Sequence, residues 1–323
     1  MSREIFYNLI RGHNALLFKI TSECNDFCNF CLEYEFIRSG RPALSFNEFK
    51  RNYSYLKKRL PIDYVILTGG EPTLHLDFFK MLRFLKNEDE GFRFITNLLK
   101  FNERQFAEGT IPIFQNLKEG KQKSLTKIIA SINDLPERSK NAKMRFLGLT
   151  KALELELPLM VTVVIYQDNL RALSQLSLRL KDLFENKGGG RFLHIEFRSI
   201  YIEGTSPELL KISLPKNFKE LKKNIEKSIE ILDTPTTKVT LWNFPLCYLD
   251  NPEKARNDAI IERQERRLIK IHKDAQIQNV EIRDWEGYLK SADTCKKCSL
   301  NKYCSGLDDL YIKKYNYPPL HPF

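Results

Sequence analysis

The sequence predicts an α/β fold in which parallel strands alternate with helices, followed by a small cysteine-rich α/β extension. Short apolar segments of strand character lie between residues 15 and 205, separated by amphipathic helical segments. Polar and cysteine motifs follow the ends of these strands, where parallel sheets bind their ligands. Six strands are too few to close a full barrel of eight. The predicted strands are residues 15–21, 63–68, 92–96, 127–132, 158–165 and 192–200.

Composition and charge limit the class of protein. The chain has 323 residues, 42% hydrophobic and 29% charged, as in a soluble globular protein. No apolar run approaches the roughly 18 residues of a membrane span, and the N-terminus lacks the layout of a signal peptide. We therefore expect a cytoplasmic protein whose seven cysteines are metal ligands rather than disulfides. The net charge of +11 is spread without a basic run, so it permits an anionic partner without requiring a nucleic acid.

Caps and apolar periodicity mark the elements between and after the strands. Ser45 and Glu48 form a capping-box pattern that opens a helix through about residue 58. Within the ambiguous residues 101–123, residues 111–114 fit either a short edge strand or a loop packed over the barrel. Glu196 and Arg198 share a strand face, and we favour an ion pair outside the site over side chains in the barrel mouth. Further helices are predicted over residues 76–86, from after 169 to about 185 and over 217–233, with another strand over 237–242.

Three cysteines on one loop are the strongest chemical signal. Cys24, Cys28 and Cys31 follow the first predicted strand at Cys-x3-Cys-x2-Cys spacing. A short loop can wrap three thiolates around one centre, which suits zinc or an iron–sulfur cluster. A cluster of four irons held by three cysteines leaves one iron open to bind something else.

A second motif follows the next strand. Gly69, Gly70, Glu71 and Pro72 form a turn in which two glycines let the backbone approach a ligand closely. The carboxylate of Glu71 can pair with a ligand ammonium, and Pro72 stiffens the turn. Taken alone, such a turn could carry an acidic residue by chance.

Together these motifs resemble the radical S-adenosylmethionine (SAM) superfamily, including the aromatic Phe30 before the last cysteine. The resemblance implies an open, TIM-like (β/α)6 partial barrel and a [4Fe–4S] cluster on the three catalytic cysteines Cys24, Cys28 and Cys31. Its open iron would chelate the amino and carboxylate groups of SAM, with residues 69–72 at the amino group. The reduced cluster would then cleave SAM and release a 5′-deoxyadenosyl radical.

The same resemblance extends to later strand ends. Thr96 and Asn97 match a family Thr-Asn-Gly motif, although Leu98 replaces the glycine. Ser131 resembles a serine that contacts SAM, and Asn169 an asparagine that touches the SAM ribose. Arg145 is the candidate partner for the SAM carboxylate, with Lys143 or Arg138 as alternatives because the spacing is loose. As simpler readings, Asp168 or Asn169 caps the next helix, and Lys143 or Arg138 is an exposed helix charge.

The remaining cysteines, Cys247, Cys295, Cys298 and Cys304, supply enough thiolates to close a second site. Their layout resembles the twitch and SPASM extensions of radical SAM enzymes, and four cysteines imply one auxiliary [4Fe–4S] cluster. Zinc is the alternative. With Asp-Trp285, the pattern resembles maturases of His-Xaa-Ser-type peptides. We therefore divide the chain into a partial barrel over residues 1–205 and a cluster-binding extension over 206–323.

These observations favour an oxidoreductase that oxidises or cross-links a ribosomally made peptide, supplied with electrons by an external donor. If every cysteine is a ligand, none is left to return a hydrogen atom or to carry a methyl group. Only 23 residues precede Cys24, so we expect either a separate protein or the basic surface of the chain itself to hold the peptide leader. The alternatives are a small-molecule dehydrogenase or lyase and, from another class, a non-enzymatic zinc-binding or RNA-binding protein.

Overall fold

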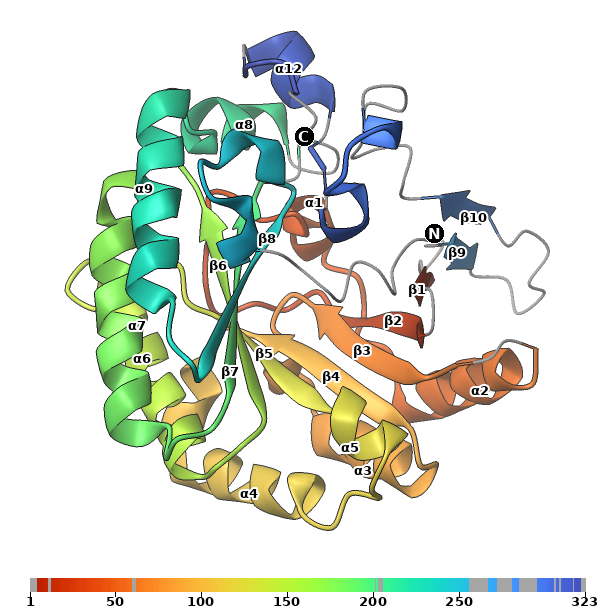
Figure 1. Cartoon of the computed structure of the whole chain (residues 1–323). Coiled ribbons are helices and arrows are strands. Elements are labelled where there is room, and N and C mark those ends of the chain that lie inside the picture. The colour runs from red at the N-terminus through yellow and green to blue at the C-terminus, as the bar shows by residue number, and fades with distance from the viewer. Residues whose placement is uncertain are drawn as a thin grey trace.

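The computed structural model describes most of the chain, including both cysteine-bearing regions (Figure 1). Trp285 lies outside the described residues, so the maturase pattern that includes it stays a prediction. In the described part of the chain, no helix combines the length and the apolar character required to cross a membrane. The described residues are 5–10, 13–59, 62–200, 202, 206–255, 267–271, 281–284, 295–304, 306–307, 309–315 and 317–320.

A parallel sheet forms the centre of the molecule. Seven strands, β2 to β8, pair with one another in chain order. The sheet is open, which confirms the predicted α/β partial barrel, although β8 adds a seventh parallel strand to the predicted six. The strands are β2 (His13–Thr21), β3 (Tyr64–Gly69), β4 (Gly91–Thr96), β5 (Lys127–Ser131), β6 (Leu159–Ile165), β7 (Leu193–Ser199) and β8 (Thr237–Trp242).

The position of β8 bears on the division into domains. Residues 237–242 were expected to be a strand of the extension, yet Leu193 to Arg198 of β7 pair in parallel with this strand. The parallel sheet therefore continues past residue 205. The division at that residue stays a prediction, but it does not coincide with the end of the sheet.

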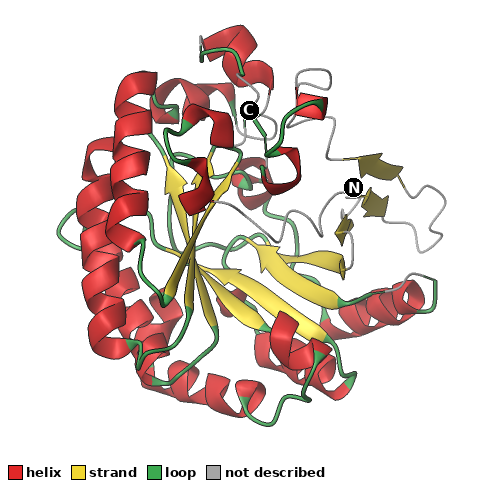
Figure 2. Ribbon diagram, in the orientation of Figure 1, coloured by secondary structure: helices red, strands yellow, loops and turns green. Residues whose placement is uncertain are grey.

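Helices surround the strands on the outer side of the barrel (Figure 2). Ser45 and Glu48 form the expected capping box at the start of α2. The α-helices are α1 (Tyr34–Arg38), α2 (Phe46–Lys57), α3 (Phe78–Asn87), α4 (Arg104–Phe114), α5 (Lys121–Leu125), α6 (Lys140–Glu154), α7 (Leu173–Lys187), α8 (Pro207–Ser213), α9 (Phe218–Leu232) and α12 (Asp309–Tyr315). Short 3-10 helices are η1 (Pro72–Leu74), η2 (Leu99–Asn102), η3 (Leu170–Ala172), η4 (Leu246–Tyr248), η5 (Pro252–Ala255) and η7 (Asn301–Tyr303).

The prediction for residues 111–114 is wrong, because they form the last turn of α4 rather than an edge strand or a loop. Gly109 and Pro112 lie inside this helix, and both have poor helix propensity. Phe106 and Ile113 are among its buried residues, so tertiary packing outweighs the local preference.

The two faces of the parallel sheet have different chemistry, because successive side chains of a strand point to opposite faces. On the outer face, paired residues such as Phe18, Leu67 and Phe94 are fully buried in the main hydrophobic core. The opposite, inner face carries polar side chains, including the paired Thr162 and Glu196. The outer face therefore holds the helices, while the inner face is chemically suited to a polar ligand.

An antiparallel extension that the sequence did not predict continues the sheet beyond β2. The strand β1 (Ile5–Ile10) pairs with β2 on one side and with β9 (Arg267–Ile271) on the other. The last strand, β10 (Glu281–Asp284), pairs with β9. A segment between Cys247 and Cys295 thus pairs with the N-terminal strand, which lies far away in the sequence.

Candidate functional site

The cysteine loop begins where β2 ends. Cys24, Cys28 and Cys31 lie on this loop as free, partly buried thiols. Burial raises the pKa of Cys24 to about 11, of Cys28 to about 12 and of Cys31 to about 11. The other two thiols contribute to the raised pKa of Cys28, so the three groups lie within electrostatic reach of one another.

The donor set of this loop fits an iron–sulfur cluster. Crowded, buried thiols of raised pKa ionise when a cation binds them, because metal binding releases their protons. Three thiolates on one loop match the cluster chemistry expected from the sequence. Among the described residues, no three Cys, His, Asp or Glu side chains already stand as a finished metal site. Assignment of the cluster to these cysteines therefore stays a proposal.

The Gly-Gly-Glu turn is joined to the cysteine loop through its backbone. The amide of Gly70 donates to the Thr21 carbonyl at 2.7 Å, and the amide of Glu71 donates to the Glu23 carbonyl at 2.7 Å. A Cβ atom added to Gly69 would lie 2.2 Å from the Thr21 oxygen, and one added to Gly70 would lie 2.0 Å from the Glu23 oxygen. The two glycines are therefore required because the turn packs closely against the backbone of the cysteine loop.

Glu71 is an internal acceptor of this turn. Its carboxylate is 2% exposed and accepts hydrogen bonds from Thr73 Oγ1 at 2.6 Å and from the Thr73 amide at 3.1 Å. It also accepts from Thr96 Oγ1 at 2.9 Å and from the Asn97 amide at 2.8 Å. Burial raises the pKa of Glu71, and these four donors oppose the shift. The carboxylate thus ties the end of β3 to the end of β4.

Asn97 extends the connection to the cysteine loop. Its Nδ2 donates to Asn25 Oδ1 at 2.8 Å, and Asn25 is the residue that follows Cys24. The next residue, Leu98, adopts a left-handed backbone with a φ of 63°. Leu98 is fully buried, so the fold retains here the backbone conformation for which glycine is usual.

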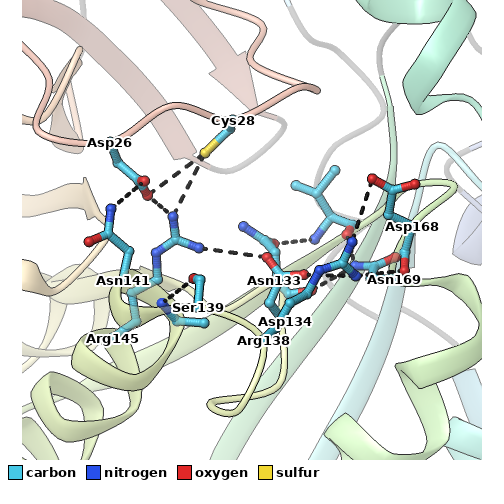
Figure 3. Close-up of polar contacts among 12 residues, drawn as sticks. Asp26, Cys28, Asn133, Asp134, Arg138, Ser139, Asn141, Arg145, Asp168 and Asn169 are labelled. Carbon is cyan, nitrogen blue, oxygen red and sulfur yellow. Dashed lines mark hydrogen bonds and ion pairs between the residues drawn. The ribbon is translucent and has the colours of Figure 1, made fainter.

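Arg145 approaches the cysteine loop from α6 (Figure 3). Its Nη2 pairs with Asp26 Oδ2 and lies 3.9 Å from Cys28 Sγ. Its Nη1 lies 4.0 Å from Asp134 Oδ2. From the same helix, Asn141 Nδ2 donates to Asp26 Oδ1 at 2.9 Å. Of the alternatives, Lys143 is exposed and Arg138 pairs instead with Asp134 and Asp168.

Asp134 joins this cluster of charges to an aromatic pair. Its Oδ1 accepts from the Tyr166 hydroxyl at 2.5 Å. The Tyr166 ring packs against Phe30, with ring centroids 4.6 Å apart. Phe30, the aromatic residue before Cys31, is therefore held at the end of β6.

Ser131 and Asn169 lie at the ends of β5 and β6. The Ser131 hydroxyl is 3.5 Å from Thr162 Oγ1 and is partly buried. Asn169 is 1% exposed, and its Nδ2 donates to the carbonyls of Asn133 and Val164. Asn169 thus braces its own loop, as Figure 3 shows, while the expected ribose contact stays a prediction.

Sequence reasoning did not include Asp26, Asn141 or Tyr166 in the site. The position of Asp26 between Cys24 and Cys28 could have predicted its role, because a carboxylate between two cluster thiolates needs a cation nearby. The expected ion pair between Glu196 and Arg198 is present, while its place outside the site stays a prediction. Glu196 is aligned with Thr162 and Thr240, and Arg198 pairs with it on the inner face.

The four C-terminal cysteines are partly buried. Cys304 Sγ accepts two backbone hydrogen bonds, from Leu246 and from Gly306, each at 3.3 Å. Leu246 immediately precedes Cys247, so Cys304 contacts the segment that carries Cys247 although the two are far apart in the sequence. Cys298 donates its amide to the Cys295 carbonyl at 3.1 Å, within one tight turn. Amide donors to sulfur are found at thiolate ligands of iron–sulfur clusters, where they tune the potential.

Comparison with known proteins supports the family resemblance. Residues 18–175 match the family model described as the radical SAM superfamily. The GTP 3′,8-cyclase of Rhodopirellula baltica is 36% identical over 83 residues, which are 24% of this chain and 23% of that protein. The GTP 3′,8-cyclase of Aquifex aeolicus is 31% identical over 153 residues, 45% of this chain and 43% of that protein. The matches therefore span less than half the length of these relatives.

Solved structures share the fold at low sequence identity. SuiB of Streptococcus suis, bound to S-adenosylmethionine, has a TM-score of 0.54 and 14% identity, covering 94% of this chain and 76% of that chain. Native anSMEcpe, with bound AdoMet and the Cp18Cys peptide, has a TM-score of 0.57 and 12% identity, covering 95% and 92%. Residues 18–175 therefore resemble the radical SAM superfamily, and the solved structures share the open α/β fold of this chain.

Proposed function

We propose that this chain is an enzyme that cleaves SAM reductively at a [4Fe–4S] cluster held by Cys24, Cys28 and Cys31. The observation that carries the proposal is the junction of the cysteine loop with the Gly-Gly-Glu turn, in a segment that matches the family model. When bound, the reduced cluster supplies the electron that cleaves SAM, and the released 5′-deoxyadenosyl radical abstracts hydrogen from the substrate.

The residues of the chain bind and orient in this proposal. The turn brings its backbone beside the cysteine loop, and Glu71 holds that backbone in place through donors from Thr73 in η1 and from Thr96 and Asn97 at the end of β4. Phe30 presents its ring next to Tyr166, where a flat ligand group can pack. On the inner face of the sheet, the partly exposed Arg198, paired with the buried Glu196, is available to a polar substrate. The further SAM-binding residues of the proposal are Gly69, Gly70, Pro72, Thr96, Asn97, Ser131 and Asn169.

For the substrate, we favour a ribosomally made peptide that is oxidised or cross-linked. The support is the C-terminal cysteine set, in which Cys304 accepts two amide hydrogen bonds beside Cys247. Such a set suits an auxiliary [4Fe–4S] cluster that accepts an electron from the substrate radical, with zinc as the alternative. The reaction then needs an external electron donor, and a separate protein can supply peptide recognition.

A second candidate is the modification of a small molecule. The two GTP 3′,8-cyclases resemble part of this chain at over 30% identity, so a small-molecule reaction is equally compatible with the sequence comparison. The two candidates differ in the substrate that loses hydrogen. Where a neighbouring gene encodes a short peptide, incubation with that peptide followed by mass spectrometry separates them. The peptide proposal expects a loss of hydrogen mass from the peptide, and an unchanged peptide mass favours the small molecule.

The site assignment is tested by replacing Cys24, Cys28 and Cys31 together with Ala. We expect SAM cleavage to disappear, because no other described cysteines lie on the loop beside the Gly-Gly-Glu turn. The C-terminal iron should remain, and replacing Cys295 and Cys298 serves as the matched control that keeps cleavage. Cleavage by the variant without the three loop cysteines would refute the assignment.

A further inference from the structure

The guanidinium of Arg145 is already engaged by groups of the protein itself. Its Nη2 pairs with Asp26 Oδ2 and donates toward Cys28 Sγ at 3.9 Å, while its Nη1 lies 4.0 Å from Asp134 Oδ2. The side chains of Arg145 and Asp26 are only 7% and 8% exposed. Asp26, together with Asp134, which Arg138 also contacts, therefore compensates the positive charge of Arg145 before any ligand arrives. A SAM carboxylate would be a third anion at a site that is already neutralised.

We propose that Arg145 is a positioning residue that clamps the cysteine loop to α6 through Asp26 and donates a hydrogen bond to the sulfur of Cys28. This role differs from the contact with the SAM carboxylate that the family resemblance implies. The part that concerns a bound cluster rests on the proposed function, whereas the clamp on the loop does not.

The hydrogen-bond donors explain why an arginine is needed at this point. As a thiol, Cys28 can donate to Asp26, and their atoms lie 4.0 Å apart. A cluster-bound thiolate has no proton to donate, so sulfur and carboxylate would face each other as two anions. The Nη2 group of Arg145 contacts both, and it supplies donors to both. A cation in this place also stabilises the additional negative charge of a reduced cluster.

Helix α6 holds the loop at two points on one helix face. Asn141 and Arg145 are four residues apart, so their side chains point the same way. Both reach Asp26, Asn141 through Oδ1 at 2.9 Å and Arg145 through Oδ2. The amide of Phe27 also donates to Oδ1 at 3.0 Å, so the carboxylate organises the loop between Cys24 and Cys28.

The closest test compares hydrogen exchange of residues 22–33 in the full chain, before and after cluster reconstitution. The variants are Asp26→Asn, Arg145→Gln and both together. Asp26→Asn keeps the acceptor Oδ1 for Asn141 and changes only the oxygen that faces Arg145. The double variant removes both charges, so it avoids the uncompensated buried carboxylate that could prevent Arg145→Gln from folding.

The matched control is Arg138→Gln, which makes the same substitution on a neighbouring arginine. Arg138 also pairs with Asp134, but its other contact is Asp168, away from the cysteine loop. A redox titration of the reconstituted chain, followed on the iron–sulfur signal that responds to added SAM, gives the second readout. SAM binding by equilibrium dialysis gives the third.

We expect each single variant at Asp26 or Arg145 to speed exchange of residues 22–33 by at least about tenfold, because a charge-assisted hydrogen bond is lost. In the double variant, exchange of residues 22–33 should be accelerated by less than the product of the two single accelerations. Arg145→Gln should lower the reduction potential, whereas Arg138→Gln should leave exchange and potential unchanged.

Two results would overturn the clamp. One is unchanged exchange and potential in Arg145→Gln together with weakened SAM binding, which is the behaviour of a SAM carboxylate ligand. The other is an equal effect of Arg138→Gln, which would assign the effect to the whole network of charges. If the wild-type chain takes up no iron, the proposed function fails, yet the exchange comparison in the cluster-free chain still decides the clamp.

Discussion

At the scale of single residues, Leu98 combines an unfavourable backbone with a favourable side chain. Its φ of 63° costs a residue with a Cβ about 1–2 kcal/mol relative to ordinary helical backbone. Its side chain is fully buried in the main core, which offsets that cost. A Cβ added to Gly148 would lie 2.3 Å from the Leu98 oxygen, so α6 approaches this turn at a glycine.

The balance at Leu98 gives an ordering of variants. Leu98→Ala keeps the backbone strain and leaves a cavity, so we expect a loss of about 2–5 kcal/mol in the free energy of unfolding. Leu98→Gly leaves a similar cavity but relieves the strain, so it should be about 1 kcal/mol more stable than Leu98→Ala. Denaturant unfolding measures both. An alanine variant as stable as the glycine variant would show that the backbone at this position is not strained.

The sequence predicted which residues belong to the site, but it did not predict the contacts that each of them makes. The strand ends bring Cys24, Glu71 and Asn97 to one edge, because parallel strands share their carboxyl ends. The bonding of Glu71 could not be predicted, since two of its four donors come from Thr96 and Asn97, at the end of a different strand. The burial of Arg145 likewise depends on the distance between α6 and the cysteine loop, which only the packed fold determines.

At the scale of elements, the junction between the turn after β3 and the cysteine loop positions the site. Gly70 and Glu71 each donate a backbone hydrogen bond of 2.7 Å to the loop. The close approach leaves no room for a side chain at Gly70, whose φ is not left-handed. A substitution at Gly70 therefore acts through this contact alone.

We expect Gly70→Ala to separate the turn from the loop and to lower the free energy of unfolding by about 1–3 kcal/mol, as overpacking does. Iron uptake by the loop cysteines should fall with it. Gly109→Ala, inside α4, is the matched control. A Cβ atom added at Gly109 would meet only the tip of the Phe79 ring, at a distance of 3.3 Å. Thermal unfolding and iron analysis compare the two variants. Equal thermal stability and equal iron content of the two variants would show that the junction does not position the site.

At the scale of the whole molecule, the alternation of strands and helices was sufficient to predict the parallel sheet. The pattern of residues 237–242 indicated a strand, but its pairing with β7 depends on a register between distant segments. The antiparallel strands β1, β9 and β10 were missed for the same reason. The helix over residues 104–114 was missed because Gly109 and Pro112 oppose it locally.

The C-terminal cysteines give a prediction about the independence of the two halves of the chain. Replacing Cys295 and Cys298 with Ala should reduce iron in the reconstituted protein from about eight to about four atoms per chain, because each cubane cluster carries four. SAM cleavage should remain, since the cysteine loop is held by the residues that follow β3 and β4 and by α6. Simultaneous loss of all iron would show that the two regions do not assemble separately.

The most direct test of the central claim is the iron and sulfide content of protein reconstituted without oxygen, measured with 5′-deoxyadenosine release from SAM and a reductant. The account predicts about eight irons per chain together with release. About four irons with one zinc would keep the SAM chemistry and make the C-terminal site structural. Absence of both iron and release would contradict the assignment of the cysteine loop and, with it, the proposed function.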